Sequence, residues 1–297
     1  MCVGIDENII WRKSKMELKK TELKFKMCGE LAGLTRTGHG YGSREGKTKT
    51  GSEYKGVKFD VIIDKKHRFK VPVEIFGITR DTVTYKDNTT NKVETAPWDK
   101  RFELRENEDY YVFPQPYDAA VQIADAASDG ENYFIKGDVV AGQYQKENKT
   151  YHTIKFSAVD AEPTASIDFG CIIEGKFIFN KVKKNKIYGF VVNYKKEVQQ
   201  ISFVWGGDAD VLKDIEECVL FGTECGVTNA KVEMGSYDKK SDDDGKAKKS
   251  FGESNIVDPT KARPCFVLYG LEITNEERYT SKDLGLDDDD IEEELFS

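Results

Sequence analysis

The chain has 297 residues, of which 38% are hydrophobic and 33% are charged, against roughly 25% charged residues in an ordinary globular domain. No stretch approaches the roughly 20 apolar residues that a membrane-spanning helix needs, and the polar, acidic N-terminus does not resemble a secretory signal. The six cysteines form no CxxC pair and the three histidines lie far apart. We therefore expect no local metal site and a reduced, cytoplasmic protein.

The charge is distributed unevenly along the chain. Residues 283–297 contain eight acidic residues and no basic one, so they carry the whole net charge of −8. Residues 1–70 carry +8, whereas residues 71–162 carry −7. A basic front and an acidic end favour a nucleic-acid partner, although a block of like charges often serves only to keep a protein in solution.

Alternating apolar and polar residues predict mainly β-strands in the first half of the chain. A Gly-rich polar loop over 33–56 follows the first strand, and residues 78–115 give a weak pattern with short strands at TVTY and RFEL. An Ala-rich helix is predicted over 116–130, between Pro116 and Gly130. The predicted strands begin at Thr21 and continue over 56–64, 68–77, 132–142 and 150–161.

The second half repeats this order of elements. A helix over 208–218 has Asp208 as its predicted N-cap, and the Ser-, Asp- and Lys-rich stretch 235–263 is expected to be disordered. The predicted strands cover 168–182, 186–194, 198–205, 219–234 and 264–273.

Three strands, a helix and two further strands are the order of an OB-fold, a five-stranded Greek-key barrel. We therefore predict an all-β protein with minor α content, built from two tandem OB-like barrels and a disordered acidic tail; a simple antiparallel sandwich is the alternative. The predicted boundaries are an N-terminal extension over 1–20, domains over 21–162 and 163–280, and the tail over 281–297.

Cations and aromatic residues alternate in the segment that joins the first two strands, TRTGHGYGSREGKTKTGSEYKG (35–56). In OB-folds this loop and the face of strands 2 and 3 bind oligonucleotides, where cations meet phosphates and aromatic rings stack on unpaired bases. The predicted DNA-binding residues here are Arg36, His39, Tyr41, Arg44, Lys47, Lys49, Tyr54, Lys55, Lys58, Phe59, Lys65, Lys66 and Arg68.

The second half carries a weaker version of the same pattern. Phe177 and Phe179 share one strand face and are expected inside the barrel, because half of an alternating strand must face the core. The predicted DNA-binding residues of this half are Lys183, Lys184, Lys186 and Tyr188, and Trp98 or Trp205 is an alternative stacking position.

Two segments resemble enzyme motifs but lack features that those motifs require. GSREGKT (42–48) has three residues between its glycines, whereas a phosphate-binding P-loop needs four. LAGLTRTGHG (31–40) begins like the LAGLIDADG endonuclease motif but contains no acidic residue to bind a metal ion. We therefore expect a protein that is not an enzyme, with no catalytic residue, metal or cofactor.

The last fifteen residues, DLGLDDDDIEEELFS, resemble the acidic tip of bacterial and phage single-stranded-DNA-binding proteins. The resemblance implies an OB-type barrel that holds single-stranded DNA and a tail that recruits replication, repair and recombination proteins. The long body without a Gln/Gly/Pro-rich linker looks more like a virus-encoded version, which would act in the host cell cytoplasm. The implied partner-binding residues are Asp287, Asp288, Asp289, Asp290, Ile291, Leu295 and Phe296.

The resulting expectation is a protein that coats and protects single-stranded DNA without sequence preference. The alternative is a β-rich protein-interaction module or virion component with a solubilising tail. The oligomeric state is left open, with a monomer favoured.

Overall fold

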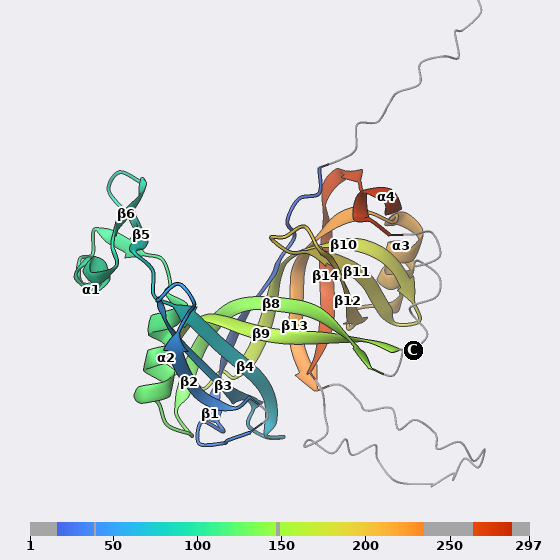
Figure 1. The fold of residues 1–297 in the computed structure, drawn as a ribbon. Helices are drawn as coiled ribbons and strands as arrows, with labels where there is room; N and C mark the ends of the chain where they lie inside the picture. Colours follow the sequence, from blue (N-terminus) through green and yellow to red (C-terminus); the bar gives the residue numbers. More distant parts are fainter. Residues whose placement is uncertain (1–16, 39, 147–148, 235–263, 287–297) are drawn as a thin grey trace, which may run out of the picture.

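The computed structural model describes residues 17–38, 40–146, 149–234 and 264–286. Two β-barrels lie side by side, and a small lobe projects from the first of them (Figure 1). Strands dominate and the helices are short, so the predicted all-β class with minor α content is confirmed. Among the described residues, no helix is both long and apolar enough to cross a bilayer.

The first barrel has the strand order of an OB-fold. Antiparallel ladders join the first strand to the second and the second strand to the third. The fourth strand pairs antiparallel with the fifth and with the first. A short parallel ladder joins the third strand to the fifth. The order of pairing is thus cyclic, and helix α2 (Pro116–Asp125) lies between the third and fourth strands, as predicted. The five strands are β1 (Leu23–Ala32), β3 (Glu53–Asp64), β4 (Phe69–Ile78), β8 (Asn132–Lys146) and β9 (Lys149–Pro163).

The second barrel repeats the same cyclic order with its own helix α3 (Ala209–Cys218). The predicted N-cap is confirmed, because the Asp208 side chain accepts a hydrogen bond from the backbone N–H of Asp210. The ladder between the third and fifth strands is only two residues long, so this barrel is partly open. Its strands are β10 (Gly170–Lys183), β11 (Lys186–Val192), β12 (Val198–Trp205), β13 (Thr223–Met234) and β14 (Pro264–Arg278).

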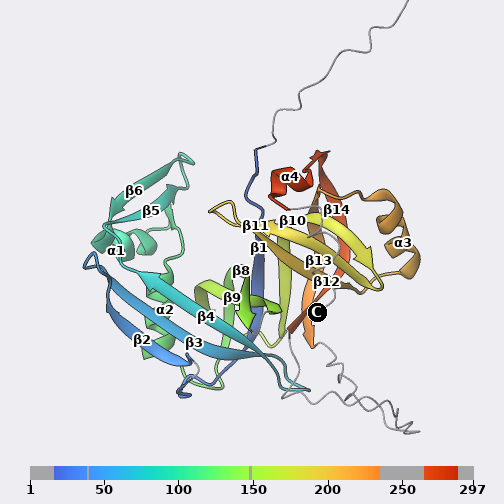
Figure 2. The ribbon, with the colours of Figure 1, turned by 45° about the vertical axis from the view of Figure 1, so that its right-hand side comes forward.

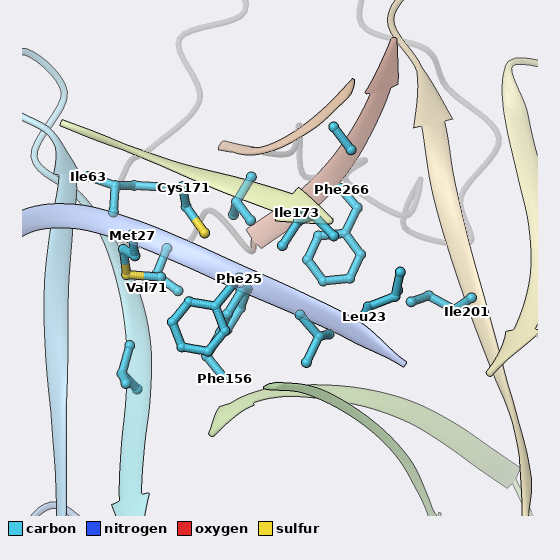
Figure 3. Close-up of a cluster of buried hydrophobic side chains, with 14 of the residues drawn as sticks. Leu23, Phe25, Met27, Ile63, Val71, Phe156, Cys171, Ile173, Ile201 and Phe266 are labelled. Atoms are coloured by element: carbon cyan, nitrogen blue, oxygen red, sulfur yellow. The ribbon is translucent and has the colours of Figure 1, made fainter. Parts of the chain in front are cut away.

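The two barrels are joined along β1, which pairs with β8 on one side and with β10 on the other. Residues Leu23 to Cys28 take part in both ladders, so one sheet runs through both barrels. Figure 3 shows that the buried side chains also form one cluster, in which Phe25 and Phe156 of the first barrel lie near Phe266 of the second.

The projecting lobe is an insertion between β4 and α2. It contains a three-stranded sheet of β5 (Thr82–Asp87), β6 (Val93–Pro97) and β7 (Tyr110–Val112). The predicted strand at TVTY is confirmed, but the predicted strand at RFEL is wrong, because these residues begin helix α1 (Arg101–Glu106) after the short turn η1 (Trp98–Lys100). Four residues are too few to separate a strand from a helical turn by periodicity. Here the contact of the Arg101 guanidinium with the Asp118 carboxylate, at 3.1 Å, fixes the turn against α2.

Two further elements differ from the sequence prediction. The expected Gly-rich loop contains strand β2 (Gly42–Lys47), which extends the sheet by pairing with the first half of β3. The expected disordered tail begins with helix α4 (Ser281–Leu284), where Thr280 and Asp283 form a capping box and Leu284 is buried. The predicted disorder at 235–263 and over 287–297 lies outside the described residues.

Candidate nucleic-acid interface

Strands β2, β3 and β4 form one continuous outer face on the first barrel. Val57, Phe59 and Val61 of β3 point into the core, so the intervening residues of the strand point outward. Across the sheet, Arg44 lies opposite Gly56, which lies opposite Phe76. We call this surface the β2–β3–β4 face, and its outward side chains are Arg44, Tyr54, Lys58, Asp60, Lys70, Pro72, Glu74, Phe76 and Ile78.

An aromatic pair, the exposed Phe76 and the half-buried Tyr54, marks the centre of this face. The rings of Tyr54 and Phe76 lie 5.7 Å apart at 34°, and the Arg44 guanidinium lies 5.5 Å above the Phe76 ring. Phe76 is 43% exposed, although a large aromatic side chain is normally buried. Gly56 makes this arrangement possible, because a Cβ there would approach both Arg44 Nε and Phe76 Cδ2 to about 3 Å.

Phe76 is a candidate residue that the sequence analysis missed. In RFKVPVEIFG the residues Phe69, Val71, Val73 and Ile75 occupy the buried positions of β4, and Phe76 stands in the polar register. An aromatic residue out of phase with the buried set was therefore visible in the sequence.

Tyr41 is held at the edge of the face by a buried carboxylate. Its hydroxyl donates a hydrogen bond of 2.5 Å to Asp60 Oδ1, while Arg36 and Lys58 place their cations 4.2 and 4.8 Å from the ring centre. Burial, followed by the hydrogen bond to Asp60, raises the pKa of Tyr41 to about 12, so the phenol is neutral at physiological pH. The structure thus brings together the predicted residues Arg36, Tyr41 and Lys58.

Two predicted DNA-binding residues face the wrong way. Phe59 is fully buried in the barrel core and has no ring face available for a base. The Lys55 ammonium is also buried, and it donates to Glu45 at 2.7 Å and to Asp125 of α2 at 2.9 Å, which raises the pKa of Lys55. Both residues share the register of Val57 and Val61, which points into the barrel.

The remaining predicted cations of the first barrel lie at the two ends of the face. Lys47 and Lys49 are exposed near the turn between β2 and β3, but Lys47 shares the register of Glu45 and points away from the face. His39 lies outside the described residues. At the opposite end, Lys65 and Lys66 are exposed in the turn between β3 and β4. Arg68 follows them and pairs with Glu30 at 3.1 Å.

The equivalent face of the second barrel is smaller. Lys183, Lys184 and Lys186 surround the turn between β10 and β11, and the half-buried Tyr188 lies opposite Lys181. The next outward residues of β11, Phe190 and Val192, are covered by a second apolar cluster. Phe177 and Phe179 are buried as predicted, and Trp205 is a core residue rather than a stacking position.

Residues near the two ends of the described chain complete this second apolar cluster. Leu284 of α4 and Tyr279 pack with Phe190 and Val192, and Leu18 and Leu286 lie against them. The backbone N–H of Lys19 donates to the Tyr279 hydroxyl at 3.3 Å, which ties the N-terminal segment to the same place. The packed part of the chain therefore continues to Leu286, past the predicted boundary of disorder, because alternate apolar residues there find a hydrophobic surface to cover. The predicted partner-binding residues, from Asp287 to Phe296, lie outside the described residues.

No protein-family model matches this sequence, and no curated protein matches it. Among solved structures, the chain is similar to the wild-type single-stranded DNA binding protein from Thermus aquaticus, with 8% identity and a TM-score of 0.43 over 88% of this chain and 97% of that one. A deletion mutant of the same protein gives 9% identity and a TM-score of 0.44 over 87% and 97%. A small single-stranded DNA-binding protein from Streptomyces coelicolor is 10% identical, with a TM-score of 0.24 over 48% of this chain and 95% of that chain.

Proposed function

We propose that this protein binds single-stranded DNA without sequence preference and that the β2–β3–β4 face is its main binding surface. The observation that carries the proposal is the exposed Phe76 ring beside Tyr54 and under the Arg44 guanidinium, on strands 2 and 3 of an OB barrel. Unpaired bases stack on such rings at roughly 1–3 kcal/mol each, and every base offers a π-face. Stacking together with cation–phosphate contacts therefore predicts affinity without base selection.

The guanidinium of Arg44 can be released to a phosphate at little cost. Arg44 is paired with Glu74, and Arg36 lies 3.9 Å from the Asp60 carboxylate, but both guanidinium groups remain about half exposed. An exposed ion pair is worth roughly 0–1 kcal/mol. An incoming phosphate can therefore take the place of Glu74 beside Arg44 without a large loss of stability, whereas Asp60 is buried and keeps the hydroxyl of Tyr41 as its partner.

Coating and protection of single strands during replication, repair and recombination follow from this mode of binding, and no catalytic step is proposed. The acidic end of the chain, with Ile291, Leu295 and Phe296 as apolar contacts, is proposed to recruit the proteins that act on this DNA. This part of the proposal, and a phage origin, depend on the resemblance of residues 283–297 to phage and bacterial tails.

A protein-binding role has one observation in its favour. The insertion lobe exposes Val93, Phe102 and Tyr111 by 61%, 53% and 50%. Exposed apolar side chains gathered on one projecting element are a feature of protein interaction sites. A purely protein-binding module, however, gives no reason for cations beside an exposed Phe76 ring on the OB face.

The test is a titration of the full chain with a fluorescent oligo-dT of about 30 nucleotides, long enough for more than one OB fold. We expect tight binding that weakens linearly with the logarithm of salt concentration. An oligonucleotide of mixed sequence should bind similarly, and a duplex of equal length more weakly. Absence of binding at low salt, or equal affinity for the duplex, would overturn the proposal in favour of the protein-binding alternative.

A further inference from the structure

The two barrels enclose a hollow of about 750 Å³ at one end of the β2–β3–β4 face. It is lined by the turn between β3 and β4, the end of β13 and the linker before β10. Figures 1 and 2 both show the tip of the β3–β4 hairpin beside the end of β13. The lining residues that matter here are Lys65, Lys66, His67, Phe169, Lys231 and Glu233.

Three lysines and three carboxylates line the hollow. Lys65, Lys66 and Lys231 line it and are exposed. The carboxylates are Asp64, Asp168 and Glu233, of which Asp64 and Glu233 accept hydrogen bonds from neighbouring side chains and keep their negative charge. Asp64 accepts from the His67 ring at 2.7 Å, which lowers the pKa of Asp64, and Glu233 accepts from the Tyr269 hydroxyl at 2.6 Å.

An aromatic ring lies among these cations. Phe169 is half-buried in the linker, and the Lys65 ammonium lies 4.6 Å from its ring centre. A cation over an aromatic ring is worth roughly 0.5–1 kcal/mol at an exposed site. The Lys65 ammonium can therefore leave the Phe169 ring for another partner at little cost. A nucleotide can take both partners at once, with its phosphate on Lys65 and its base on the Phe169 ring.

We propose that this hollow is the point where a single strand leaves the first barrel and passes to the second. The inference rests on the proposed function, and it assigns to the hollow a sugar–phosphate backbone with one base against Phe169. The hollow is separate from the aromatic pair on the face. Phe69 and Phe76 mark the two ends of β4, and seven residues of extended strand span about 23 Å.

Because the hollow and the aromatic pair are separate, the experiment compares the binding of a short strand with that of a long strand. A short oligo-dT of about 6 nucleotides fits within one OB fold, and one of about 30 nucleotides can cover both barrels. The test variant replaces Lys65, Lys66 and Lys231 by Ala, and a second variant carries Phe169→Leu alone. The control variant replaces the exposed lysines Lys92, Lys195 and Lys213 by Ala, which removes the same charge elsewhere.

We expect the test variant to bind the long strand at least tenfold more weakly than the wild type at low salt. Its log–log salt slope should fall by about 2, since each neutralised phosphate contributes about 0.7 to the slope. Phe169→Leu should weaken long-strand binding with an unchanged slope. Binding of the short strand by both variants, and of both strands by the control, should match the wild type.

Two results would overturn the proposal that a single strand passes between the barrels at this hollow. One is long-strand binding that stays at the wild-type level in both variants while Phe76→Leu weakens it, which leaves the proposed function standing. The other is an equal loss in the control, which would show a general effect of charge. A wild-type chain that binds neither strand would instead refute the proposed function.

Discussion

The ring of Phe156 stands edge-on to the ring of Phe266, with centroids 6.0 Å apart and planes at 84°. Phe156 belongs to the last strand of the first barrel, and Phe266 belongs to the last strand of the second. Phe25 packs on the other side of Phe156 at 5.2 Å, and Phe203 packs against Phe266 at 6.0 Å. A row of buried rings therefore passes from one barrel into the other, and the two barrels share a core.

This contact predicts that the barrels unfold together. A double-mutant cycle of Phe156→Leu and Phe266→Leu should give a coupling free energy of about 0.5–1.5 kcal/mol, the range of edge-to-face aromatic pairs. Urea unfolding followed by tryptophan fluorescence and by circular dichroism should show coincident transitions. Phe76→Leu is the control, because an exposed ring should change the free energy of unfolding by less than about 0.5 kcal/mol. Zero coupling with two separate transitions would mean independent barrels.

The stacking residues can be separated from core residues by matched Leu variants. Phe76→Leu and Tyr54→Leu keep an apolar side chain but remove the ring, so affinity for oligo-dT should fall by roughly 1–3 kcal/mol per stacking position. Phe102→Leu, which alters an exposed ring of the lobe, should bind like the wild type. Phe59→Leu should lower the free energy of unfolding, since it alters a buried core ring. Wild-type affinity in both Phe76→Leu and Tyr54→Leu would place the stacking surface elsewhere.

The exposed cations of the segment over 35–56 should determine the salt dependence. Replacing Arg36, Arg44, Lys47 and Lys49 by Ala should reduce the log–log salt slope of oligo-dT binding by about 0.7 for each phosphate that is no longer neutralised. Lys55→Met is the matched control, because the Lys55 ammonium is enclosed by Glu45 and Asp125 and does not reach the face. Its slope should equal that of the wild type. An unchanged slope in the fourfold variant would exclude this hairpin from the DNA contact.

Tyr41 provides a prediction for alkaline pH. Because its folded-state pKa is raised to about 12 from 10, the stabilisation that Tyr41 contributes is complete below pH 10 and is lost between about pH 10 and 12. Absorbance at 295 nm should show a tyrosine that titrates near pH 12. Asp60→Asn should lower this pKa without restoring it fully, because burial contributes more than the hydrogen bond. Identical titration curves for the two proteins would contradict the Tyr41–Asp60 hydrogen bond.

The acidic end should compete with DNA for the cations. Deleting residues 287–297 should tighten binding of oligo-dT at low salt, with a smaller gain near physiological ionic strength, where the Debye length is about 8 Å. The deletion must begin after Leu286, because Leu284 and Leu286 pack on the second barrel. Phe296→Ala should weaken recruitment of a replication protein and leave the competition unchanged. Equal DNA affinity of the two chains at every salt concentration, with unchanged recruitment, would reduce this segment to a solubilising role.

The sequence by itself determined the strands and helices of the two barrels and their order, but it did not predict strand β2, helix α4 or most elements of the insertion lobe. The strand over 198–205, the Asp208 N-cap and the helix at the same place in each half follow from local patterns, namely alternation and a side chain that accepts a backbone N–H. Because the helix follows three strands in both halves, the OB architecture was predictable without any knowledge of long-range contacts.

The tertiary structure alone decided which predicted binding residues are exposed and which are enclosed. Lys55 looked available as one of many cations in the sequence, and α2 and β2 enclose it. Phe59 looked available as an aromatic residue beside cations, and the core of the first barrel encloses it. The alternation of side chains along a strand determines which residues share a face. The element that packs on that face comes from a distant part of the chain. Burial, and with it the choice between core and binding surface, is therefore a property of long-range packing rather than of local sequence.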